Sequence, residues 1–170
     1  MRSIMLAGLL ALSAPAAAEI VTAGPNGFEV RETASIVAPV PQAYAAFSRI
    51  GSWWSGEHSY SGEAANLRLD LRAGGCFCER WDGNGVEHGR VVMLMPGKLL
   101  RLDAALGPLQ ELAISGVINV ALEEKEGTTT MVVTHRVSGD ATHKLDGLAP
   151  IVDQVNGLQF GNLAAEAAKP

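Results

Sequence analysis

The chain has 170 residues, of which 48% are hydrophobic and 18% are charged, with 13 lysines and arginines against 18 aspartates and glutamates. This length fits one domain, and the apolar fraction supports a buried core, which argues against general disorder. A net charge of −5 argues against a nucleic-acid-binding surface. Two cysteines are too few for a disulfide-stabilised scaffold.

Residues 1–18 are typical of a secretory signal peptide. Arg2 carries a positive charge, residues 4–12 are apolar, and residues 14–18 supply small side chains before a cleavage point after Ala18. The apolar run is shorter than the roughly 20 residues that a membrane-spanning helix needs. We therefore expect a periplasmic or secreted protein without stable membrane insertion, with a single domain over residues 19–170 and its core at about 28–165.

The first elements of the expected mature chain are a strand and two short helices. Residues 29–38 are rich in Val, Ile and Thr, which predicts a strand that ends at Pro39. Pro41 begins a short helix that ends near Gly51, because proline is favoured in a first helical turn. A second short helical turn starts at residues 52–54.

A series of antiparallel strands and a long helix follow. Alternating leucines predict a half-buried strand over 66–72. Residues 76–81 and 86–95 flank a hairpin turn, and the later strands are expected over 98–104, 112–123 and 128–137. Residues 148–168 predict a helix with an imperfect apolar stripe at Ile151, Val155, Leu158 and Leu163.

This order predicts an α+β fold. We expect a curved antiparallel sheet of about six to seven strands wrapped around the long C-terminal helix, with two short helices after the first strand. A gap between the sheet and that helix would form a cavity.

The order and several segments resemble the START-like or SRPBCC superfamily, whose fold is called the helix-grip. Within it, the similarity is to the branch of polyketide cyclases and the C-terminal domain of Hsp90-ATPase activators. The segments that carry it are 37–47, 53–54, 60–79, 91–102 and 106–109. The resemblance implies a deep pocket that relatives use for lipids, polyketides, hormones or aromatic compounds. It transfers no catalytic residue, because the superfamily has no universal one.

Two titratable side chains are candidates for proton transfer. His135 shares a strand face with Met131, Val133 and Val137, and a partly desolvated histidine can act as an acid or base near neutral pH. Glu79 shares a face with Phe77 and Trp81. If that face points inward, Glu79 enters the cavity beside His135 and burial raises its pKa. The alternatives are a core histidine with satisfied hydrogen bonds, and a glutamate paired with an arginine on a solvent-facing side.

Other candidate ligand-binding residues form an aromatic cluster after the first helix. They are Trp53, Trp54, His58 and Tyr60, which the resemblance places at the pocket mouth. Phe77, on the strand face of Glu79, is a further candidate. Rings there can stack on a ligand, or they can pack a short helix on the sheet. The orientation of His88 stays open, because both faces of its predicted strand are apolar.

Three interpretations fit Cys76 and Cys78. They are buried thiols, a disulfide favoured by an oxidising compartment, or part of a metal site with a histidine from another strand. A single Cys-x-Cys motif is a weak zinc signal, so we expect no metal and no other cofactor.

Three functions are consistent with the sequence. The first is an exported binding protein whose partner is a small hydrophobic or aromatic molecule. The second is a cyclase, dehydratase or isomerase that uses His135 and Glu79. The third is a protein-interaction domain like the Hsp90 activators, which predicts an exposed apolar patch and a negligible cavity.

Overall fold

The computed structural model describes residues 17–169, which form one antiparallel sheet and three α-helices. The strands lie in the spatial order β1-β2-β8-β7-β6-β5-β4-β3. Their bounds are β1 (Ala17–Gly24), β2 (Gly27–Ile36), β3 (Leu67–Leu69), β4 (Cys76–Trp81), β5 (Asn84–Met95), β6 (Leu99–Asp103), β7 (Ser115–Lys125) and β8 (Thr128–Ser138). The helices are α1 (Val40–Ala45), α2 (Ile50–Trp53) and α3 (Ala149–Ala167).

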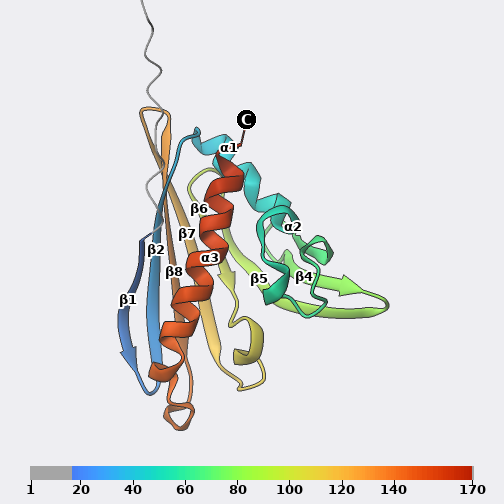
Figure 1. Ribbon diagram of the computed structural model, residues 1–170, viewed down its shortest axis with the longest axis vertical. Helices are drawn as coiled ribbons and strands as arrows, with labels where there is room; N and C mark the ends of the chain where they lie inside the picture. The colour runs from blue at the N-terminus through green and yellow to red at the C-terminus, as the bar shows by residue number, and fades with distance from the viewer. Residues whose placement is uncertain (1–16, 170) are drawn as a thin grey trace, which may run out of the picture.

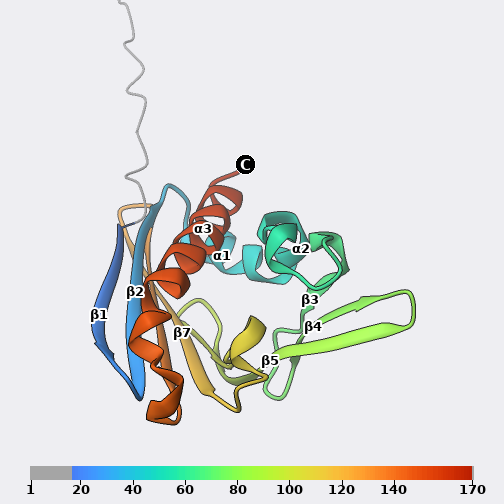
Figure 2. The same ribbon diagram turned by 60° about the horizontal axis from the view of Figure 1, so that its bottom comes forward.

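Helix α3 lies along one face of the sheet, as Figure 1 shows. It contacts β1 and β2 as well as α1 and α2. The β4–β5 hairpin extends away from the other strands, and α2 lies near its base (Figure 2). The predicted α+β helix-grip arrangement is confirmed, with an open sheet of 8 strands.

Alternation along the strands decides which side chains meet α3. In β2 the even-numbered residues from Phe28 to Ile36 are buried, and in β8 the odd-numbered residues from Thr129 to Val137 are buried. Successive strand residues point to opposite faces, so these buried residues share the face covered by the helix. The core lies between this face and the α3 side chains Phe160 and Leu163.

The extra strand is β1. Its residues Ala17 and Ala18 pair with Thr33 and Glu32, whereas the sequence pattern places both alanines in the predicted signal peptide. Residues 1–16 of that segment lie outside the described residues. Cleavage after Ala18 stays a prediction, and it would remove the first part of β1. None of the helices among residues 17–169 is long and apolar enough to cross a membrane.

The apolar stripe predicted for the C-terminal helix is largely wrong. Of its members only Leu163 is buried, while Ile151 and Leu158 are 59% and 44% exposed. The buried face carries polar side chains instead, including Asn156 and Gln159. Polar groups can occupy such a face where they meet hydrogen-bond partners or a cavity, and the apolar periodicity of the sequence reports neither.

Candidate functional site

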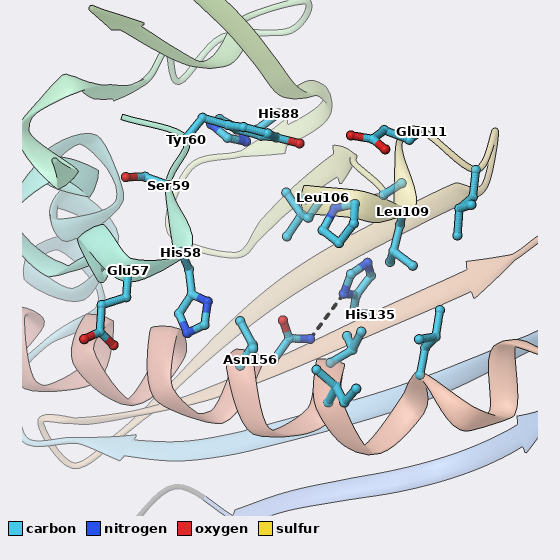
Figure 3. A pocket seen from close by; sticks show the side chains of 18 of the residues that line it. Glu57, His58, Ser59, Tyr60, His88, Leu106, Leu109, Glu111, His135 and Asn156 are labelled. Carbon is cyan, nitrogen blue, oxygen red and sulfur yellow. Dashed lines mark hydrogen bonds between the residues drawn. The ribbon is translucent and has the colours of Figure 1, made fainter. Parts of the chain in front are cut away.

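A cavity of about 560 Å³ lies between the N-terminal half of α3, the segment after β6, and the segment after α2. This volume is within the range of small-molecule sites. Figure 3 shows side chains from these elements converging on it. The lining residues are Trp54, Glu57, His58, Ser59, Tyr60, His88, Ala105, Leu106, Gly107, Pro108, Leu109, Glu111, Leu112, His135, Leu148, Ile151, Val152, Val155 and Asn156.

Most of the cavity wall is apolar. Leu106 and Leu109 come from the segment after β6, and Val152 and Val155 come from α3. Leu106 has a φ of 69°, a conformation that costs a non-glycine residue free energy. A wall of this kind favours an apolar ligand, because burial of apolar surface is the main favourable contribution in such sites.

The aromatic cluster predicted at the pocket mouth divides between the cavity and the core. Trp54, His58 and Tyr60 line the cavity. Trp53 is buried in the core, where its indole N–H donates to the Ala46 carbonyl at 2.9 Å. Phe77 is also a core residue, and its ring lies against those of Trp54 and His88. Neither Trp53 nor Phe77 is among the lining residues.

His135 reaches the cavity from β8, on the inward face that the alternation predicted. It is 1% exposed, and its Nδ1 lies 3.2 Å from the side-chain nitrogen of Asn156 (Figure 3). Burial lowers the pKa of His135 to about 4, although the Ala104 carbonyl and Asn156 act in the opposite direction. The ring is therefore neutral at neutral pH.

The second ring nitrogen of His135, Nε2, is buried and has no hydrogen-bond partner among residues 17–169. The Ala104 carbonyl raises the pKa of the ring, but it is not a hydrogen-bond partner of Nε2. A buried polar atom without a partner is uncommon in folded proteins. The site therefore contains one unused hydrogen-bonding group on a mostly apolar wall.

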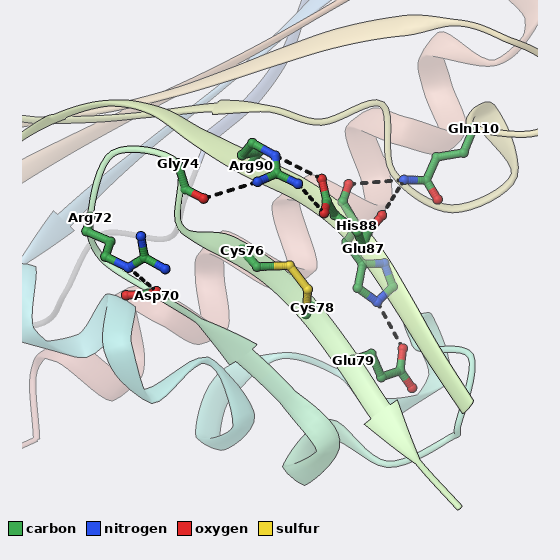
Figure 4. Close-up of a disulfide and its surroundings, with 10 residues drawn as sticks. All are labelled: Asp70, Arg72, Gly74, Cys76, Cys78, Glu79, Glu87, His88, Arg90 and Gln110. Carbon is green, nitrogen blue, oxygen red and sulfur yellow. Dashed lines mark hydrogen bonds and ion pairs between the residues drawn. A yellow bond between two sulfur atoms is a disulfide. The ribbon is translucent and has the colours of Figure 1, made fainter. Parts of the chain in front are cut away.

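Glu79 is fully buried and is paired with His88 rather than His135. Its Oε2 lies 2.9 Å from Nε2 of His88 (Figure 4), and its carboxylate accepts the backbone N–H groups of Tyr60 and Ser61 at 3.0 and 2.6 Å. No hydrogen bond joins Glu79 to His135 in residues 17–169. Glu79 is not a lining residue, and its hydrogen bonds to the backbone of Tyr60 and Ser61 hold that part of the cavity wall in place.

The expectation of a raised pKa for Glu79 is wrong. Burial by itself raises the pKa, but hydrogen bonds from Ser61, Tyr60 and His88 outweigh it, and the pKa is lowered. Hydrogen bonds to the charged form stabilise a carboxylate even where water is excluded. No arginine contributes to this network, so the solvent-facing alternative is also wrong.

A β-bulge explains the orientation of His88, which the sequence left open. Phe77 pairs with Gly89 and Cys78 pairs with Glu87, so His88 is an extra residue in β5 without an opposite number in β4. A bulge changes the direction of the side chain that it carries. The His88 ring is 5% exposed, lines the cavity and stacks on Tyr60 with ring centroids 5.8 Å apart.

Several lining residues were not predicted as site residues. Leu106 and Leu109 belong to a segment of family resemblance but are not among the predicted site residues. Asn156 is not among them either. Asn156 carried a usable signal, because a polar residue in the middle of a packed helix needs a partner. No local sequence pattern indicates the orientation of His88, because the bulge that sets it depends on how β4 and β5 pair.

Cys76 and Cys78 form a disulfide on β4, with Cα atoms 5.4 Å apart (Figure 4). Phe77 and Glu79 are buried between the sheet and the helices, so the alternating cysteines face the other side of the strand. The sulfur atoms and the Glu87 carboxylate lie within 4.8 Å of one another. In the disulfide form this group offers no thiolate, which is the form of cysteine that binds metals.

Comparisons with known proteins show the fold. No family model and no curated protein matches the chain. A solved structure from Rhizobium leguminosarum is 20% identical, with a TM-score of 0.57 and coverage of 91% of this chain and 98% of that one. A protein of unknown function from Staphylococcus aureus is 14% identical, with a TM-score of 0.60 and coverage of 83% and 93%.

A third structure, from Rhodobacter sphaeroides, is 16% identical, with a TM-score of 0.57 and coverage of 89% of this chain and 98% of that one. At such identities the likeness extends to the fold and not to a ligand or reaction. The chain therefore shares its α+β helix-grip fold with bacterial proteins that are distant from it in sequence.

Proposed function

We propose that the protein binds a small hydrophobic or aromatic molecule in the cavity between α3 and the sheet. The observation that carries this proposal is the mostly apolar cavity of about 560 Å³. Trp54 and Tyr60 supply aromatic rings at its edge, where they can stack on a planar ligand. The polar lining groups are few, as is usual where they orient a ligand that apolar contacts hold.

The test is binding of the apolar fluorescent probe N-phenyl-1-naphthylamine. Val155→Trp places a large side chain in the cavity, while Leu158→Trp adds the same side chain at an exposed position of the same helix outside it. We expect Val155→Trp to weaken probe binding at least tenfold and Leu158→Trp to leave it unchanged. Equal binding by both variants would show that the probe binds elsewhere, and would reject the proposal.

The natural ligand can be sought in the protein purified from its own organism. Solvent extraction followed by mass spectrometry should recover an apolar molecule from the wild type. Recovery should fall in the Val155→Trp variant and persist in Leu158→Trp.

A second candidate function is proton transfer of the cyclase, dehydratase or isomerase type. The hydrogen bond between Glu79 and His88 supports it, because a carboxylate that accepts the Nε2–H of a histidine leaves Nδ1 free to accept a proton. Here His88 takes the part that the sequence assigned to His135. The reaction needs no co-reactant if the proton taken from one carbon returns to another.

Deuterium exchange tests this second function. NMR in D₂O follows the protons next to the carbonyl of 2-acetonaphthone in the presence of the protein. Exchange above the buffer rate in the wild type, lost in His88→Gln and kept in His143→Gln at a histidine outside the cavity, supports catalysis. Exchange at the buffer rate in the wild type counts against it.

The cavity counts against the Hsp90-activator-like function, which predicted a negligible one. We also propose export to the periplasm or beyond, on the basis of the charged, apolar and small-residue segments in residues 1–18. Mass spectrometry of the protein from a cell fraction tests this, because cleavage after Ala18 leaves Glu19 as the first residue.

A further inference from the structure

We propose that His135 and Asn156 bind the polar end of the ligand as a pair, and that this end is an uncharged carbonyl with an adjacent N–H or O–H. This inference rests on the proposed binding function and specifies its ligand class. Amides and hydroxy ketones on an apolar body belong to that class.

The pair is built from two elements that pack together. His135 is on β8 and Asn156 is on α3, and both side chains are buried, at 1% and 3% exposure. Their hydrogen bond of 3.2 Å holds the ring and the amide in fixed orientations at the cavity wall. A binding group that is already oriented loses little freedom when a ligand arrives.

The hydrogen bond also determines which ring nitrogen carries the proton. When the Asn156 side-chain N–H donates to Nδ1, that nitrogen uses its lone pair, and the proton of the neutral ring is on Nε2. Nε2 has no partner in the described part of the chain. It is therefore a buried donor, and a carbonyl oxygen of the ligand is the acceptor that satisfies it.

Asn156 contributes the complementary group. In Figure 3 its amide oxygen points away from His135 and toward the cavity. This oxygen accepts no hydrogen bond from residues 17–169, so it is available to an N–H or O–H of the ligand. Turning the amide over exchanges the roles of the two residues but still leaves one donor and one acceptor.

The charges around the cavity favour an uncharged ligand. Glu57 and Glu111 are in the lining, which contains neither lysine nor arginine. Burial keeps His135 neutral at neutral pH, so the pair supplies no positive charge to an anion. A ligand carboxylate at the pair would lose its hydration without gaining a lysine, an arginine or a charged His135 as its partner.

The experiment compares three probes with one aromatic body. Naphthalene-2-carboxamide has the carbonyl and N–H groups, 2-isopropenylnaphthalene has a similar shape without them, and 2-naphthoate carries a charge. Affinities are measured by displacement of N-phenyl-1-naphthylamine. For the wild type we expect the carboxamide to bind at least tenfold more tightly than either of the others.

The variants separate the pair from the rest of the cavity. His135→Phe and Asn156→Leu should remove the preference for the carboxamide while binding of the hydrocarbon is retained. Gln154→Leu, which makes a similar change at an exposed position of the same helix outside the cavity, should keep the preference. A preference that persists in both pair variants would overturn the inference.

A second measurement uses the wild type only, in case a variant does not fold. In ¹⁵N NMR, the His135 ring should be neutral with its proton on Nε2. The chemical shift of Nε2 should change when the carboxamide is added and should not change when the hydrocarbon is added. Equal affinity for carboxamide and hydrocarbon, with no such shift, overturns this inference and leaves the proposed function standing. Failure of all three probes to bind overturns both.

Discussion

The imidazole of His88 and the carboxylate of Glu79 meet at 2.9 Å inside the β4–β5 hairpin because His88 is the extra residue of a bulge. In a regular strand, the side chain of residue 88 would point to the face opposite to those of its two neighbours, and the bulge removes this constraint. The same carboxylate holds the backbone at Tyr60 and Ser61. One buried charge thus connects the hairpin, the cavity wall and the mouth.

Glu79→Gln should destabilise the protein by about 2 kcal/mol, because an amide cannot accept all the hydrogen bonds that the carboxylate accepts. Its NH₂ group faces a backbone N–H at either Tyr60 or Ser61. Urea denaturation followed by tryptophan fluorescence measures the change. Glu87→Gln, on the exposed side of the same hairpin, is the control and should cost less than about 1 kcal/mol. Equal effects for both variants would contradict the role given to Glu79.

Glu32 should make stability fall as the pH rises. It is 1% exposed, and neither of its side-chain oxygens has a hydrogen-bond partner in the part of the chain that the structure describes. Burial, and after it the charge of Asp153, raises its pKa from 4.5 to about 7. Between these values the unfolded chain releases the proton first. The unfolding free energy therefore decreases from pH 4.5 to about 7, by an amount on the order of 3 kcal/mol.

His135 acts in the opposite direction, because its pKa is lowered from 6.5 to about 4 and its stabilising effect is lost as the pH falls through that interval. In the wild type the two effects therefore oppose each other over much of the acidic range. In Glu32→Gln the rise in the unfolding free energy that His135 causes between pH 4 and 6.5 should no longer be opposed by Glu32. Urea denaturation at a series of pH values tests this, with the exposed Glu123→Gln as a control that should keep the wild-type profile. An unchanged profile in Glu32→Gln would mean that Glu32 titrates normally.

Gly89→Ala should destabilise the protein by about 1–3 kcal/mol. A Cβ atom at Gly89 would lie 2.5 Å from the Cβ of Ala104 and 2.8 Å from the Asp103 carbonyl oxygen, so backbone must move. The backbone that would move, at residues 103–104, directly precedes Leu106 in the cavity wall. The affinity for the fluorescent probe should therefore fall as well. Gly147→Ala meets no atom within 4 Å, and thermal unfolding should show it to be neutral or slightly stabilising. An unchanged stability of Gly89→Ala would contradict the close approach of Gly89 to residues 103–104.

Loss of the disulfide should have a small effect. The bond joins residues separated by 2 positions, so it restricts the unfolded chain little, and its removal should cost less than about 2 kcal/mol. The double variant Cys76→Ala, Cys78→Ala should keep its affinity for the fluorescent probe, because the cysteines face away from the cavity. Denaturation with and without reductant, with alkylation to count free thiols, checks the first point. A strong loss of probe binding would contradict the second.

Local patterns in the sequence were enough for most of the fold. The β4–β5 hairpin lies where the turn residues and the side-chain alternation predict it, and α3 has Pro150 in its first turn. These elements depend on turn chemistry, proline placement and side-chain alternation, which act over a few residues. The first strand was missed because its first residues, Ala17 and Ala18, also fit the small-residue end of a signal peptide.

The sequence by itself determined the α+β class, the inward face of His135 and the aromatic character of the cavity mouth. Only the tertiary structure decided that Glu79 pairs with His88, that Trp53 and Phe77 belong to the core, and that Asn156 lies against His135. The physical reason is that a residue's face follows from its immediate neighbours, whereas its partner depends on strand register and on the packing of α3 over the sheet. Those are set by contacts between residues far apart in the chain.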